Sequence, residues 1–172
     1  MSISVKNFGD YSVKAIKSFQ GREGYGFNAN LYRGKKKVAF AMDSANGGEI
    51  DIDWVGDRKA IESEMKLLQA HLATLPPVKS EYASVGELTI DASWFVTDCV
   101  TKWERDRDMR KMVKQCKTKT LYRTLDHKFG QYAIMASPCH DGTRLMLKRA
   151  YGEDVEIFND VIAEGKLPSV MG

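Results

Sequence analysis

The stretch YGFNANLY, residues 25–32, decides the fold class. Apolar side chains at its odd positions alternate with Gly, Asn, Asn and Tyr at its even positions, and this period of two is typical of a strand with one buried face. We therefore predict a strand that buries Phe27 and Leu31 and turns Asn28 and Asn30 away from the core.

The same alternation recurs on both sides of this stretch. Residues 13–19, 38–42 and 50–54 repeat it, and glycine-containing turns at 34–36 and 46–48 separate the later runs. A four-stranded antiparallel meander is therefore expected. Its expected inward side chains are Val13, Ala15, Phe19, Tyr25, Phe27, Ala29, Leu31, Val38, Phe40, Met42, Ile50, Ile52 and Trp54.

An amphipathic helix follows the meander. Apolar residues recur at steps of four and three from Ile61 to Leu75, Asp57 can cap the start, and Pro76-Pro77 stops the helix. We expect this helix to cover the sheet. The Pro-Pro step and the polar stretch through Ser84 suggest a boundary between domains 1–78 and 79–172, unless residues 1–172 form one cooperative unit.

The second half is expected to be a helical region with a β-hairpin, which makes the whole chain α+β. A helix should run from about Asp91 to Cys116, with a bend, a break or two different packing partners, because its apolar stripe changes side after Trp103. Two further features are expected. The first is a hairpin of 121–125 and 132–136 around Lys128-Phe129-Gly130. The second is a pair of short helices, one that starts at Ser137-Pro138 and ends at Gly152 and one that starts at Asp154 and ends at Gly165.

Composition limits the class of protein. The 172 residues are 43% hydrophobic and 28% charged, as in ordinary globular proteins, and the net charge is only +3. The amino terminus carries no basic region followed by an apolar run, and no stretch reaches the ~20 apolar residues of a membrane helix. Three cysteines without a C-x-x-C pair indicate reduced thiols. We expect a cytoplasmic protein with no membrane contact.

One short motif resembles an RNA-recognition signature. GYGF at residues 24–27 matches its centre, in which strand aromatics stack on bases. Glu23 stands where the signature has a basic residue, and Asn28 stands where it has a buried valine. The alternation also assigns both rings to the core, so base stacking on Tyr25 and Phe27 is not favoured.

Four carboxylates could gather on or near one face of the meander. Asp43, Glu49, Asp51 and Asp53 are weak candidates for a Mg²⁺ or Ca²⁺ site, which would make the protein a metal-dependent enzyme. A solvated sheet face or a charged edge that discourages strand addition is favoured, because no glycine stands at the fixed offset of a calcium-binding loop.

No catalytic residue and no cofactor is predicted. Cys139-His140-Asp141 contains the residue types of a thiol nucleophile with its base, but neighbouring side chains point in different directions and the stretch fits a helix cap. The histidines and cysteines never form the short pairs of a structural zinc site.

The strongest feature is a basic stripe. Between Lys102 and Lys128 ten Lys and Arg stand among four acids, so this stretch carries +6. It could contact a phosphate backbone or an acidic protein surface, or form a solvated face with local ion pairs. The predicted binding residues are Lys102, Arg105, Arg107, Arg110, Lys111, Lys114, Lys117, Lys119 and Arg123.

The first third of the chain resembles a segment of small uncharacterised accessory proteins of bacteriophages and other mobile elements. The resemblance rests on GREGYGFNANLY at 21–32, KKVAF at 36–40 and ANGGE at 45–49. It implies a bacterial host cell and a protein that binds and modulates or inhibits a host component, including a defence-system protein. We rank a non-enzymatic protein binder first, a nucleic-acid binder second and a metal-dependent enzyme third.

Overall fold

The structure is a computed structural model that describes residues 4–79, 86–128 and 130–171. The fold is α+β, as predicted, and the chain divides into two compact units, one ending at Trp103 and the other spanning Glu104–Gly172. The expected division after residue 78 stays a prediction about which parts fold independently.

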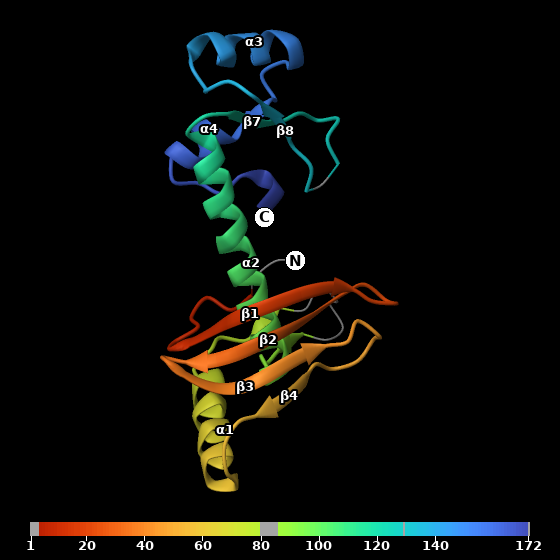
Figure 1. Ribbon diagram of the computed structural model, residues 1–172, viewed down its shortest axis with the longest axis vertical. Helices are drawn as coiled ribbons and strands as arrows, with labels where there is room; N and C mark the ends of the chain where they lie inside the picture. The colour runs from red at the N-terminus through yellow and green to blue at the C-terminus, as the bar shows by residue number, and fades with distance from the viewer. Residues whose placement is uncertain (1–3, 80–85, 129, 172) are drawn as a thin grey trace. The chain divides into compact units, whose positions relative to one another are not determined.

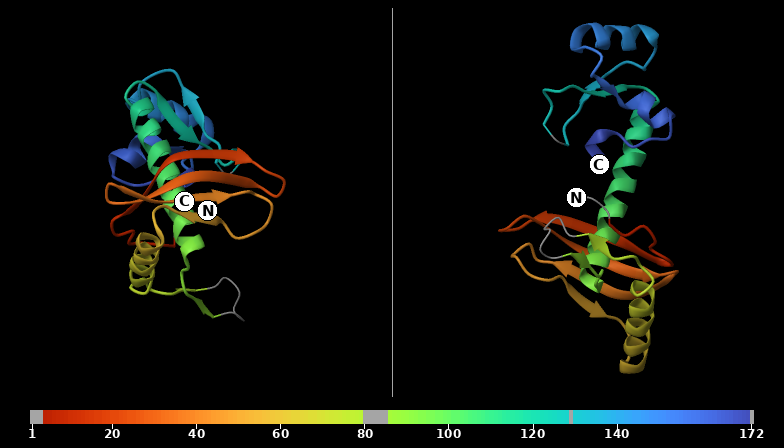
Figure 2. Two further views of the ribbon diagram at one scale, coloured as in Figure 1. Left: turned by 60° about the horizontal axis from the view of Figure 1, so that its bottom comes forward. Right: turned by 180° about the vertical axis from the view of Figure 1, so that it is seen from behind.

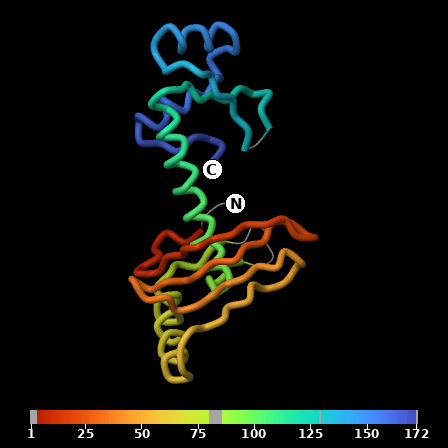
Figure 3. Tube along the Cα trace, viewed as in Figure 1, coloured from red at the N-terminus to blue at the C-terminus, as the bar shows by residue number. Residues whose placement is uncertain are grey.

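The first unit contains the predicted meander. Strands β1 (Tyr11–Gln20), β2 (Tyr25–Arg33), β3 (Lys36–Asp43) and β4 (Asp51–Trp54) pair antiparallel in chain order. Their hairpin connections can be followed in Figures 1 and 3, and their side-by-side order is visible in both views of Figure 2. A second, two-stranded sheet pairs β5 (Val78–Lys79) with β6 (Glu87–Leu88).

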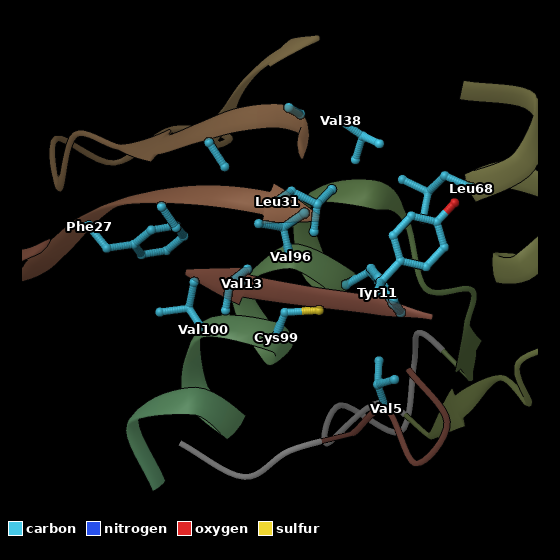
Figure 4. Close-up of a cluster of buried hydrophobic side chains, with 14 of the residues drawn as sticks. Val5, Tyr11, Val13, Phe27, Leu31, Val38, Leu68, Val96, Cys99 and Val100 are labelled. Atoms are coloured by element: carbon cyan, nitrogen blue, oxygen red, sulfur yellow. The ribbon is translucent and has the colours of Figure 1, made fainter. Parts of the chain in front are cut away.

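The inner face of β2 is the face that the alternation predicts. Phe27 and Leu31 are buried, whereas Asn28 and Asn30 lie half-buried on the opposite, outer face. On β4, Ile52 and Trp54 pack against the core, and Asp51 and Asp53 point the other way, also as predicted. Figure 4 shows side chains of this core, with Phe27 and Leu31 among those labelled.

The predicted facing of β3 is wrong. Ala39 and Ala41 are fully buried opposite Leu31 and Ala29, whereas Phe40 and Met42 lie half-buried on the outer face. The register of β2 and β3 shifts between Leu31 and Tyr32, and this irregularity buries Val38 next to Ala39. A side-chain period read from apolar content alone cannot detect such a shift.

Three other expected core residues are also placed differently. The register of β1 shifts between Lys14 and Lys17, where Ala15 has a φ of 53° and is exposed. Beyond this bulge Phe19 lies opposite Gly26 on the outer face and is 38% exposed. Tyr25, at the start of β2, is 76% exposed.

The sheet is covered mainly by a different helix from the one expected. Helix α1 (Arg58–Leu72) begins after Asp57, whose Oδ1 accepts a hydrogen bond from the Ala60 amide at 2.8 Å, but its only buried side chains are Glu64 and Leu68. Helix α2 (Ala92–Cys116) instead buries several side chains against the strands, as Figure 4 shows. They are Phe95, Val96, Cys99 and Val100.

The second unit confirms the predicted hairpin and adds a strand to it. Strands β7 (Thr120–Arg123) and β8 (Ala133–Met135) pair antiparallel, and β9 (Glu156–Ile157) pairs with the other edge of β7. Of the tripeptide expected at the turn, Phe129 lies outside the described residues. The helix expected from Asp154 begins only at Phe158, because the preceding residues form β9.

Three helices and two small cores complete the second unit. Helices α3 (Asp141–Tyr151) and α4 (Phe158–Ala163) are followed by a short 3-10 helix, Ser169–Met171. Met112 of α2 packs with Leu121 and Phe158, so α2 has two different packing partners along its length, one of the three alternatives expected for it. The other core is formed by Leu147, Val155 and Ile157.

Candidate binding surface

The carboxyl-terminal half of α2 separates an apolar side from a cationic side. Each residue of an α-helix is rotated by about 100° from the one before it. On this basis the side of α2 opposite Met112 carries four cations within an arc of about 100°, namely Arg107, Arg110, Lys111 and Lys114. Lys117 follows directly after the helix and is exposed. These five residues, Arg107, Arg110, Lys111, Lys114 and Lys117, are called the basic helix face below.

Two members of the basic helix face are paired with an acid. Arg107 Nε donates to Asp108 Oδ1 at 2.9 Å, and Lys111 Nζ lies 3.4 Å from the same oxygen. The hydrogen bond from Arg107 Nε raises the pKa of Arg107. Burial favours the neutral Asp108, but the hydrogen bonds and positive charges of Arg107 and Lys111 together outweigh it, so the pKa of Asp108 falls below its usual value. Asp108 thus offsets part of the positive charge of Arg107 and Lys111 at one end of the basic helix face.

The other three cations have no such compensation. Arg110, Lys114 and Lys117 are exposed, and within the described part of the chain no acid forms an ion pair with them. An exposed, uncompensated cluster of this kind can attract carboxylates or phosphates from another molecule.

The remaining predicted stripe residues do not join the basic helix face. Lys102 belongs to the first unit, and Arg105 lies two turns before Met112, on the same side of the helix. Lys119 lies beyond the helix. Arg123 serves the fold of the second unit, because its Nη1 donates to Ser169 Oγ at 2.9 Å and its Nη2 reaches the His127 carbonyl at 3.4 Å. Whether any of them binds a partner stays a prediction.

The net charge of the chain is concentrated in the unit that carries this face. Residues 104–172 contain thirteen Lys and Arg and ten Asp and Glu, a balance of +3, whereas residues 1–103 contain thirteen of each. The formal +3 of the whole chain therefore arises in the second unit alone.

The four carboxylates of the meander are not gathered around one point. Asp43 Oδ1 accepts from the Ala45 amide at 2.8 Å, and Glu49 is exposed before β4. Asp51 and Asp53 lie at the sheet edge, opposite Met42 and Phe40. In residues 4–79, 86–128 and 130–171 no group of three or more His, Cys, Asp or Glu is placed to hold a metal ion.

Cys139-His140-Asp141 forms the start of α3. The Nδ1 of His140 accepts a hydrogen bond from the Thr143 amide at 3.3 Å and caps the helix, and Asp141 pairs with Arg144 at 3.0 Å. Burial raises the pKa of Cys139, which disfavours the nucleophilic thiolate. Burial likewise raises the pKa of Cys99 to about 12. The histidine thus acts on the backbone amide of Thr143, a role that the sequence already favoured.

No helix among the described residues has both the length and the apolar character needed to cross a membrane. The chain matches no protein-family model, no curated protein and no solved structure at a significant level.

Proposed function

We propose that this protein is a non-enzymatic binding protein that docks an acidic protein surface on its basic helix face. The observation that carries the proposal is the exposed trio Arg110, Lys114 and Lys117, which lacks ion-pair partners in the described part of the chain. The opposite side of the helix is fixed to a core through Met112, so the cations project from a packed element.

The arrangement has an energetic cost in the free protein. Like charges four residues apart on a helix destabilise it by a few tenths of a kcal/mol, and both Arg107 with Lys111 and Arg110 with Lys114 have this spacing. A cation near the carboxyl end of a helix is favoured by the helix dipole, but that effect is limited to the last turn and accounts for Lys114 alone. Binding an acidic partner would relieve the repulsion.

Two features favour a protein over a nucleic acid on this face. The cations span only about 15 Å along the helix axis, and Glu104, Asp106 and Asp108 precede or interrupt them. Mixed charge of this kind selects a complementary pattern, whereas it would repel a uniformly charged phosphate backbone. The resemblance to proteins of mobile elements adds a bacterial host protein, such as a defence component, as the proposed target.

The test compares two charge-reversed variants in a bacterial lysate. R110E/K114E/K117E reverses the uncompensated trio, and K35E/K59E/K66E makes the same change in charge at three exposed lysines of the first unit. Captured proteins are cross-linked and quantified by mass spectrometry. We expect the trio variant to lose a protein that the wild type and the control variant both retain, while all three show the same thermal unfolding.

Equal capture by all three would contradict the proposal. Salt-sensitive binding to random nucleic acid, lost only in the trio variant, would favour the nucleic-acid alternative instead.

A further inference from the structure

The outer face of the four-stranded sheet carries a repeated pattern across its strands. Directly paired residues of antiparallel strands share a face, so the register defines which side chains lie in a row. One row reads Lys17, Asn28, Met42, Asp51, and the next reads Lys14, Asn30, Phe40, Asp53. Each row therefore passes from a lysine on β1 through an asparagine and an apolar side chain to an aspartate on β4.

Aromatic rings lie on and beside these rows. Besides Phe40, the outer face carries Phe19 opposite Gly26 and Tyr32 opposite Lys37. A Cβ added at Gly26 would lie 2.8 Å from the Phe19 ring, so that ring spans the glycine and covers the end of the sheet. Phe19 is 38% exposed, and Tyr32 and Phe40 are half-buried, so all three rings are in part open to solvent.

Lysines are held close to two of the rings. Lys14 Nζ lies 4.5 Å from the centroid of Tyr32, and Lys37 Nζ lies 6.0 Å from that of Phe40, both within cation–π range. Lys14 and Lys17 are exposed, and no ion pair with an acid of the described chain is formed by either. Positive charge and aromatic surface therefore occur together where β1 meets β2, through Lys14 and Tyr32, and again on β3, through Lys37 and Phe40.

The face thus has a chemical polarity that matches one class of ligand. A nucleotide carries negative charge at its phosphate, an aromatic ring in its base, and amino donors on the base edge. Lysines attract phosphates, aromatic rings stack on bases in a sequence-tolerant way, and Asn and Asp side chains accept from exocyclic amino groups. Along both rows, cationic, amide, apolar and acidic side chains follow one another in that order from β1 to β4, and Lys37 adds one further cation on β3.

We propose that the outer sheet face binds single-stranded nucleic acid, with the sugar–phosphate backbone along β1 and the bases over β2 and β3. Asp51 and Asp53 exclude the backbone from the β4 side and so fix this orientation. A duplex keeps its bases stacked on one another and cannot place them on the rings, so the site discriminates against it. This surface is distinct from the basic helix face and uses residues of the first unit only.

The test is a titration of fluorescein-labelled single-stranded oligonucleotides of about 12 nucleotides, followed by anisotropy at low salt. K14E/K17E reverses the cationic side, and Y32L/F40L removes two rings while keeping apolar side chains. We expect each pair of changes to weaken binding about tenfold or more, because stacking and phosphate contacts each contribute at that level. An unlabelled duplex of the same sequence should not compete.

Matched controls separate this site from the rest of the molecule. K35E/K59E makes the same charge change at exposed lysines off the outer face, and Y25L removes an exposed ring on the other side of β2. Both should bind within about twofold of the wild type. The proposal is overturned by undetectable binding, by equal affinity of K14E/K17E and the wild type, by effective competition from the duplex, or by loss of binding in R110E/K114E/K117E instead.

Discussion

Glu64 shows how a single buried charge is stabilised in the first unit. Its side chain is 4% exposed, accepts from Arg33 Nε and Nη2, both at 2.9 Å, and accepts from Lys36 Nζ at 2.7 Å. The hydrogen bonds from Arg33, opposed by burial and helped by Lys36, lower the pKa of Glu64 to about 2. A carboxyl whose pKa is lower in the folded than in the unfolded chain stabilises the fold above its unfolded pKa.

The first prediction follows from the direction of the pKa shift of Glu64. The stabilisation by Glu64 should be complete at neutral pH and should be lost as the pH falls from about 4.5 toward 2. Glu64→Gln should lower the free energy of unfolding at neutral pH by about 3 kcal/mol and remove much of the loss in acid. Urea unfolding across this pH range measures both effects.

Glu62→Gln is the matched control for that measurement. Glu62 lies on the same helix and pairs with Arg58, but its side chain is 55% exposed. Its replacement should change stability by less than about 0.5 kcal/mol and leave the acid dependence intact. If the free energy of unfolding of Glu64→Gln depended on pH as in the wild type, Glu64 would not be the carboxyl that causes the loss of stability in acid.

At the scale of single residues, the sequence predicts side-chain facing only where strand pairing is regular. Alternation places Asn28 and Asn30 outward and Ile52 inward, and the structure agrees. It fails at Phe40 because a bulge at Val38 within β3 reverses the facing, and it fails at Phe19 because a second bulge lies within β1. Alternation alone therefore does not predict the outer sheet face, because it places Phe19 and Phe40 in the core.

Among the elements, α2 depends on two separate cores. Its first half buries Phe95 and Val96 against the sheet, and its second half buries Met112 with Leu121 and Phe158. The change of side in its apolar stripe was visible in the sequence and indicated two packing partners. That α1 buries little beyond Glu64 and Leu68 could not be predicted, because an apolar stripe does not indicate how much of it other elements cover.

The second prediction measures the contribution of α2 to the sheet core. Phe95 is fully buried and lies 5.6 Å, centroid to centroid, from the Tyr11 ring, so Phe95→Ala should cost about 3–5 kcal/mol through lost burial and a cavity. Val113→Ala changes a 40% exposed residue of the same helix and should cost less than about 1 kcal/mol. Chemical denaturation of both variants tests this. A Phe95→Ala protein as stable as Val113→Ala would show that α2 does not supply the cover.

For the whole molecule, the two units differ in charge and in the surfaces that they offer. The first unit is electrically balanced and carries the outer sheet face, whereas the second has the entire +3 and the basic helix face. The positive stretch itself is a property of the sequence, and its role in binding stays a prediction. The sequence could not show that Arg123 bonds to Ser169, because that contact depends on packing in three dimensions.

The most direct test of the binding proposal is the rate at which the captured host protein associates with wild-type protein, R110E/K114E/K117E and K35E/K59E/K66E at several salt concentrations. Complementary charge accelerates association more than it slows dissociation. We predict that the trio variant associates about tenfold or more slowly at low salt, that the difference shrinks as salt is added, and that the control variant matches the wild type. Equal association rates for all three proteins at low salt would contradict the assignment of the basic helix face as the docking surface.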